Sequence, residues 1–137
     1  MYPSELTTPI AKDLTDFGFQ GLTTSQEVSD MIENQKGTVL LVVNSVCGCA
    51  AANARPGAKI AVSQGKKPDQ LITVFAGVDR DAVDKAREYL LPYPPSSPSI
   101  ALFKDGKLVH MLERRHIEGN SAQTIAHNLV EAFEVHC

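Results

Sequence analysis

Runs of apolar and β-branched residues predict the strands of this chain. The clearest run is 38–46 (TVLLVVNSV), in which apolar residues follow one another without polar alternation. A strand that is apolar on both faces is typical of a sheet covered by helices above and below. Three more strands are predicted at 71–77, 99–104 and 107–112, the last two joined by an Asp105-Gly106 hairpin turn.

Helical spacing of apolar residues fills most of the remaining chain. A helix beginning near Pro3 is predicted by apolar residues at 6, 10, 14 and 17. A second helix begins at the capping-box sequence 24–27 (TSQE) and ends by Gly37. Further helices are predicted at 50–62, at 80–90 and from residue 120 or 121 onward, with Pro56 expected to kink or end the first part of the 50–62 helix.

The order of these elements predicts the fold class. After two extra N-terminal helices it runs strand, helix, strand, helix, strand, strand, helix. Such an order is typical of an α/β fold, here with a central mixed four-stranded sheet flanked by helices. The sequence has no internal repeat, low-complexity tract or linker, so residues 1–137 are expected to form a single domain.

Composition and charge exclude several classes of function. The net charge is −3 and no run of Lys or Arg occurs, which argues against a nucleic-acid partner. The longest apolar run, 39–43, is too short to cross a membrane, and the N-terminus has no signal-peptide pattern. The sequence therefore predicts a cytoplasmic protein with neither a nucleic-acid nor a membrane partner, and it leaves the oligomeric state open.

Two of the three cysteines form the motif Cys47-Gly48-Cys49, placed where a strand ends and a helix is predicted to begin. The free N–H groups and the positive dipole end of a helix N-terminus stabilise a thiolate, which is the nucleophile of disulfide exchange. Cys47 is therefore the predicted attacking thiol and Cys49 the candidate resolving thiol. A disulfide between residues i and i+2 requires Cys47 to lie outside the helix and Gly48 to let the backbone bend, and its tight ring is expected to be easily reduced.

Two other interpretations of the motif remain open. In one, Cys47 and Cys49 bind a metal ion, and further ligands such as Cys137, His116 or His136 are needed to complete the site. In the other, the protein is an interaction domain whose thiols are inert. The redox interpretation, which predicts no metal site, is the preferred one because no second ligand pair has the usual close spacing.

The segment 97–107 (SPSIALFKDGK) resembles the stretch of thioredoxins in which a cis-proline opens a strand and a Phe-Lys-Asp-Gly turn closes it. In that family the proline packs beside the active-site cysteine, and the neighbouring backbone receives substrate. The resemblance thus implies that Pro98 is cis and that Ser97 contributes to substrate binding.

Nearly the whole chain resembles the bacilliredoxin family, most specifically at 43–51 (VNSVCGCAA), 54–56 (ARP), 113–119 (ERRHIEG) and the final Cys137. The resemblance implies a thioredoxin-like fold and removal of bacillithiol from S-bacillithiolated client proteins through a mixed disulfide on Cys47. Cys49 or a second bacillithiol then releases the adduct, so bacillithiol is a cosubstrate and no cofactor is bound. Weak disulfide isomerase activity is also associated with the family.

Four polar residues are further candidates for this site. Arg55 and Arg114 offer bidentate forks for the carboxylates of a small anionic thiol such as bacillithiol. Asn44 and Ser45 directly precede the motif and are candidates to donate hydrogen bonds to the thiolate. The alternative for the arginines is ordinary surface charge, and for Asn44 and Ser45 it is a turn at the end of the strand. No acidic residue lies in 38–46, so a buried proton-relay carboxylate on that strand is not expected.

Overall fold

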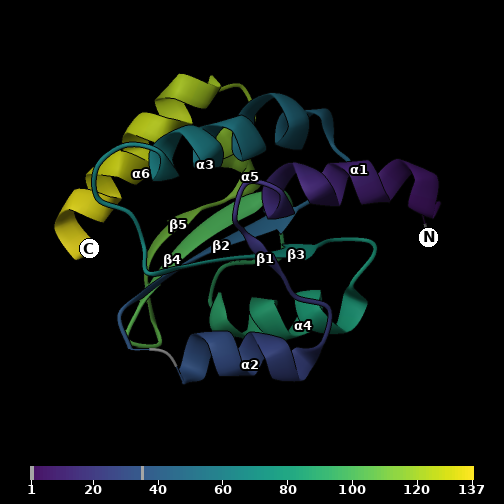
Figure 1. Ribbon diagram of the computed structural model, residues 1–137, viewed down its shortest axis with the longest axis horizontal. Helices are drawn as coiled ribbons and strands as arrows, with labels where there is room; N and C mark the ends of the chain where they lie inside the picture. The colour runs from purple at the N-terminus through teal and green to yellow at the C-terminus, as the bar shows by residue number, and fades with distance from the viewer. Residues whose placement is uncertain (1, 35) are drawn as a thin grey trace.

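A computed structural model describes residues 2–34 and 36–137 of the chain as a mixed sheet between two layers of helices (Figure 1). The strands are β1 (Gln20–Gly21), β2 (Thr38–Asn44), β3 (Gln70–Phe75), β4 (Ser99–Lys104) and β5 (Lys107–Leu112). The helices are α1 (Ser4–Thr15), α2 (Ser25–Glu33), the π-helical turn η1 (Ala50–Ala54), α3 (Arg55–Val62), α4 (Arg80–Tyr89), α5 (Arg114–Ile117) and α6 (Ala122–His136).

The sheet has the strand order β1-β3-β2-β4-β5 and confirms the predicted mixed sheet. β2 runs parallel to β3 and antiparallel to β4, so its carboxyl end lies beside the end of β3 and the start of β4. The predicted number of four strands is wrong, because β1 pairs in parallel with the outer edge of β3. β1 has only two residues and no apolar alternation, so the pairing depends on the neighbouring strand rather than on a local sequence signal.

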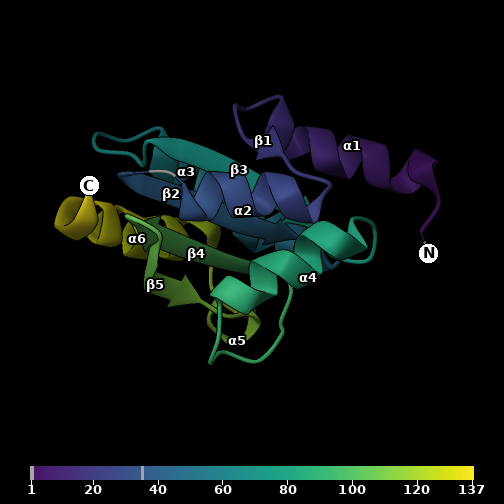
Figure 2. The same cartoon turned by 90° about the horizontal axis from the view of Figure 1, so that it is seen from below.

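β2 is the centre of the protein, and all seven of its residues are buried. Leu40 and Val42 belong to the apolar cluster beneath α1, α3 and α6, whereas Leu41 and Val43 belong to the cluster beneath α2 and α4. Figures 1 and 2 show these two helical layers on opposite faces of the sheet. Each such side chain contributes roughly 1.5–3 kcal/mol by leaving water, which accounts for the absence of polar alternation in 38–46.

The predicted 50–62 helix divides into η1 and α3. Pro56 lies in the first turn of α3, where its missing N–H cannot donate to the carbonyl of Ala52. The wider π-helical turn occupies the place where that α-helical bond would form, which is the physical reason for the departure from a regular helix. The capping box of α2 forms as predicted, with Thr24 Oγ1 accepting from the Glu27 N–H at 3.2 Å.

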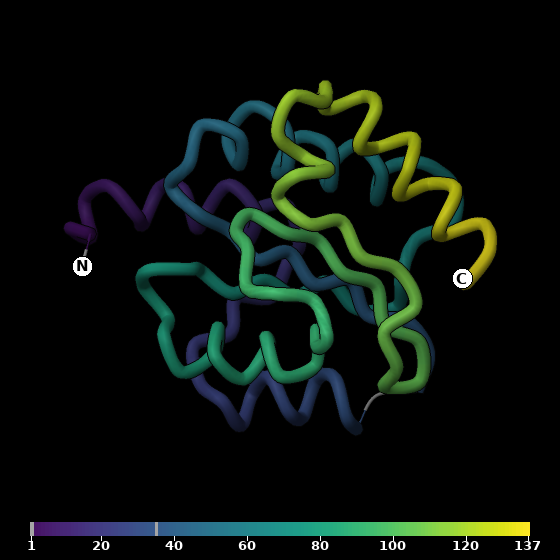
Figure 3. The backbone as a smooth tube through the Cα atoms, turned by 180° about the vertical axis from the view of Figure 1, so that it is seen from behind, coloured from purple at the N-terminus to yellow at the C-terminus, as the bar shows by residue number. Residues whose placement is uncertain are grey.

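The positions of the two termini and the length of the helices complete the description of the fold. The N- and C-termini lie on opposite sides, as Figures 1 and 3 show. Within the two ranges that the structure describes, no helix has both the length and the apolar character needed to span a bilayer.

The close packing of α3 on α6 gives a testable consequence. A Cβ added at Gly57 would lie 2.7 Å from Ile125 Cγ2 and 3.2 Å from the carbonyl oxygen of Ala122. Gly57→Ala is therefore expected to lower the free energy of unfolding by about 1–3 kcal/mol through overpacking, although alanine is the better helix former. Urea denaturation measures this, and an unchanged or raised stability would contradict the packing described.

Candidate active site

The Cys47-Gly48-Cys49 motif lies directly beyond the carboxyl end of β2, at the junction that the sequence predicted. Helical backbone begins at Gly48 and continues through η1 into α3. The carbonyl of Cys47 accepts hydrogen bonds from the N–H groups of Ala50 (3.0 Å) and Ala51 (3.3 Å). Cys47 is therefore the last residue before a helix N-terminus, where unpaired N–H groups favour an anion.

The two sulfur atoms of the motif are neighbours. Cys47 and Cys49 are both free thiols and half-buried, and their Sγ atoms lie 2.7 Å apart. Gly48 between them is exposed, has no left-handed φ, and has open space where a Cβ would stand. In this dithiol form the backbone does not use the conformational freedom that the sequence analysis assigned to Gly48.

The surroundings of the two thiols separate their acidities. The pKa of Cys47 is lowered by a hydrogen bond from the Cys49 thiol, by the backbone N–H groups of Cys49 and Ala50, and by the charge of Arg114, against the opposing effect of burial. The pKa of Cys49 is raised by burial first and then by the neighbouring Cys47. The arrangement thus favours an anionic Cys47 beside a protonated Cys49.

Arg114 connects the cysteine motif to the proline loop. Its Nη2 donates to Cys47 Sγ at 3.3 Å, and its Nη1 donates to the carbonyl oxygen of Ser97 at 3.3 Å. Its Nε pairs with Glu118 at 2.9 Å, which fixes the side chain although 46% of it stays exposed. The structure therefore brings together Cys47, Ser97 and Arg114, although Cys47 and Arg114 are 67 residues apart in sequence.

The loop before β4 has the backbone geometry that the thioredoxin resemblance implied. The Ser97–Pro98 peptide bond is cis, and so is Leu91–Pro92, for which the sequence analysis made no prediction. Pro98 is buried, whereas residues 91–95 are exposed. Pro94 and Ser96 of this loop line one hollow together with Arg114, which donates to the Ser97 carbonyl.

Asn44 and Ser45 form hydrogen bonds within the loop that precedes the motif rather than to the Cys47 sulfur. They were expected to donate to the thiolate, but Asn44 Oδ1 accepts from the Ser45 N–H at 2.9 Å, and Ser45 Oγ accepts from the Cys47 N–H at 3.2 Å. Arg55, expected to meet a substrate carboxylate, is only 7% exposed. Its Nε donates to Asp13, a residue that the sequence analysis did not select.

The alternative metal site is not assembled. The Sγ of Cys137 lies 3.7 Å from Thr38 Oγ1 at the start of β2, about 20 Å from the end of that strand at its usual rise per residue. The Nδ1 of His116 accepts from the Glu113 N–H at the start of α5. Among residues 2–34 and 36–137 no three His, Cys, Asp or Glu side chains are grouped as metal ligands.

Comparisons with known proteins agree with this geometry. Residues 2–137 match the family model described as disulphide isomerase. The chain is 54% identical to a bacilliredoxin of Cytophaga hutchinsonii over 98% of both chains, and 47% identical to a bacilliredoxin of Halalkalibacterium halodurans over 99% of this chain and 94% of the other. Its fold resembles mitochondrial thioredoxin 3 of Saccharomyces cerevisiae, with a TM-score of 0.59 and 18% identity over 90% of this chain and 98% of that one.

The contact between Arg114 and Cys47 can be tested by alkylation. Arg114→Gln removes the nearby positive charge, so the pKa of Cys47 should rise and less thiolate should be present at neutral pH. The alkylation rate of Cys47 with iodoacetamide at pH 7 is expected to fall about fivefold. Peptide mapping by mass spectrometry measures the rate at this cysteine.

Arg115→Gln is the matched control. Arg115 is adjacent in sequence, pairs with Glu113 at 2.8 Å and is largely exposed. The Arg115→Gln variant should leave the alkylation rate of Cys47 unchanged. Equal effects of the two variants would mean that general surface charge, and not the Arg114 contact, sets the reactivity of Cys47.

Proposed function

Because this chain belongs to the bacilliredoxin family and is a thiol–disulfide oxidoreductase, we propose that it removes bacillithiol from S-bacillithiolated proteins. The observation that carries the proposal is the position of Cys47 Sγ, which lies at a helix N-terminus between the guanidinium of Arg114 and the thiol of Cys49. A thiolate so placed is suited to attack a disulfide.

The first step is attack on the bacillithiol sulfur of the client's mixed disulfide. The Cys47 thiolate forms a new S–S bond to bacillithiol while the bond between bacillithiol and the client breaks. The electron pair of that bond leaves with the client sulfur, which departs as a thiolate and takes a proton from water. The client is thereby reduced, and the oxidising equivalent passes to the Cys47–bacillithiol disulfide.

The second step removes bacillithiol from Cys47. Cys49 Sγ, 2.7 Å from Cys47 Sγ in the dithiol form, loses its proton and attacks Cys47, forming an internal disulfide and releasing bacillithiol as a thiolate. A second bacillithiol is the alternative attacking thiol and would leave as bacillithiol disulfide. The raised pKa of Cys49 keeps it protonated until the adduct on Cys47 has removed the neighbouring negative charge.

A hollow of about 610 Å³ beside Arg114 is the proposed place for the anionic part of bacillithiol. It is lined by Pro94, Ser96, Glu113, Arg114, Arg115 and Glu118. Two guanidinium groups there offer forks for carboxylates. Bacillithiol thus acts as a cosubstrate in the cytoplasm, and thiols carry all of the chemistry without a bound cofactor. Arg55 is left out of this binding role because it is buried and its guanidinium donates to Asp13, Asn44 and Ser45.

The test is a trapping experiment read by intact mass. Cys49→Ala, mixed with an S-bacillithiolated client protein, is expected to gain one bacillithiol while the client loses one, because the adduct on Cys47 has no internal thiol to release it. Cys47→Ala is the matched control and should gain nothing. A client carrying S-cysteine instead of bacillithiol should transfer more slowly if the anionic part of bacillithiol is recognised.

The outcomes separate the candidate functions. Unmodified variants with a fully modified client would contradict the proposal. A mixed disulfide between Cys47 and the client itself would instead favour disulfide isomerase activity, a second function that the description of the matched family supports.

A further inference from the structure

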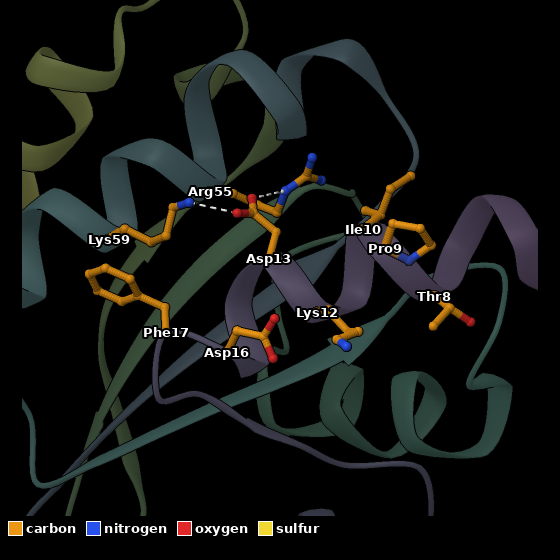
Figure 4. Close-up of a pocket in the computed structure, with 9 residues that line it drawn as sticks. All are labelled: Thr8, Pro9, Ile10, Lys12, Asp13, Asp16, Phe17, Arg55 and Lys59. Carbon is orange, nitrogen blue, oxygen red and sulfur yellow. Dashed lines mark hydrogen bonds and ion pairs between the residues drawn. The ribbon is translucent and has the colours of Figure 1, made fainter.

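A charged network joins α1 and α3 to the loop that precedes the cysteine motif. Figure 4 shows Asp13 of α1 between Arg55 and Lys59, which belong to the first two turns of α3. Asp13 Oδ2 accepts from Arg55 Nε at 2.9 Å, and Asp13 Oδ1 accepts from Lys59 Nζ at 2.6 Å. The three side chains line an open hollow of about 830 Å³, which Cys47 does not line.

Arg55 is the member of this network whose burial is energetically unfavourable unless its charge is balanced. Its side chain is 8% exposed, and a guanidinium buried to this extent must be paired and fully hydrogen-bonded to be tolerated. The carboxylate of Asp13 supplies the counter-charge. Although burial raises the pKa of Asp13, the hydrogen bonds from Lys59 and Arg55 outweigh it and keep the carboxyl ionised at neutral pH.

The other end of the guanidinium holds the chain just before the cysteine motif. Arg55 Nη1 donates to Asn44 Oδ1 at 3.0 Å and to the Ser45 carbonyl at 3.3 Å. Asn44 Oδ1 also accepts from the Ser45 N–H, and Ser45 Oγ accepts from the Cys47 N–H at 3.2 Å. An unbroken series of hydrogen bonds therefore runs from Asp13 to the backbone of Cys47.

We propose that Asp13 and Arg55 are positioning residues that set the reactivity of Cys47 through this series of bonds. Neither of them contacts the sulfur. Arg55 fixes the loop 44–47, and the loop fixes the direction of Cys47 Sγ toward the N–H groups of the following turn. The inference rests on the proposed role of Cys47 as the attacking thiol, but it is independent of which thiol the protein removes.

Each member of the pair has a variant that weakens the series without removing a side chain. Asp13→Asn keeps the shape but takes away the counter-charge of the buried guanidinium. Arg55→Lys keeps the charge, but an ammonium lacks the rigid fork that serves Asp13, Asn44 and Ser45 together. In both variants the pH midpoint for alkylation of Cys47 is expected to rise toward that of an ordinary cysteine, and the rate at neutral pH to fall roughly ten- to a hundredfold.

Lys59→Gln is the matched control. Lys59 binds the same carboxylate as Arg55 and lies over the Phe17 ring at 5.8 Å, so its loss disturbs the contact of α1 with α3. None of its contacts reaches loop 44–47. This variant should therefore lose some thermal stability while its pH midpoint and alkylation rate stay those of the unaltered protein.

The experiment is iodoacetamide alkylation of the full chain across a pH series, with the rate at Cys47 followed by peptide mapping and the melting temperature recorded for each variant. Raised midpoints for Asp13→Asn and Arg55→Lys, against an unchanged midpoint for Lys59→Gln, support the proposal. Lowered melting temperatures with the midpoint unchanged in all three variants would overturn it, since the network would then be structural only.

If both charge variants fail to fold, Ser45→Ala removes the last acceptor in the series, and an unchanged midpoint in that variant would overturn the proposal. Iodoacetamide needs no bacillithiol, so a failure of bacillithiol transfer leaves this result standing. Faster alkylation of Cys49 than of Cys47 in the unaltered protein would instead contradict the proposed function.

Discussion

The structure depends on one arrangement, which places the sulfur of Cys47 beyond the end of a buried strand and at the start of a helix. β2 is buried along its whole length, and the chain leaves it at Asn44 to reach Cys47 three residues later. At that point the helical turn contributes N–H groups, Arg114 contributes a positive charge, and Cys49 contributes a thiol proton. All three lower the pKa of Cys47, whereas burial and the neighbouring Cys47 raise the pKa of Cys49, so two identical side chains differ in acidity.

Elements remote in sequence converge on this junction from two sides. Arg114, at the start of α5, donates both to Cys47 Sγ and to the Ser97 carbonyl that precedes the cis-proline, so it connects the cysteine motif to the proline loop. From the other side α1 supplies Asp13, which neutralises the buried Arg55 that holds the loop 44–47. Burying a guanidinium is unfavourable in itself, and the positioning role proposed for Arg55 is a physical reason for retaining it.

Local pattern was sufficient to predict the four longer strands, the longer helices and the place of the motif. The β-branched run 38–46 marked the central strand, and the capping box at Thr24 marked a helix start that the structure confirms. The two-residue β1 and the π-helical turn were missed because each is decided by packing or by a lost hydrogen bond. The partners of Arg55 and Arg114 were also missed, since contacts across 42 and 67 residues leave no signal in a single sequence.

The most direct test of this account is an NMR titration of the chain with ¹³C-labelled cysteine, in which the Cβ shift of each thiol is followed against pH. The account predicts that Cys47 titrates first, below the ordinary range for cysteine, and that Cys49 titrates later, above that range. The opposite order, or two indistinguishable curves near the ordinary value of about 8.5, would contradict the central claim that this junction selects Cys47 as the thiolate.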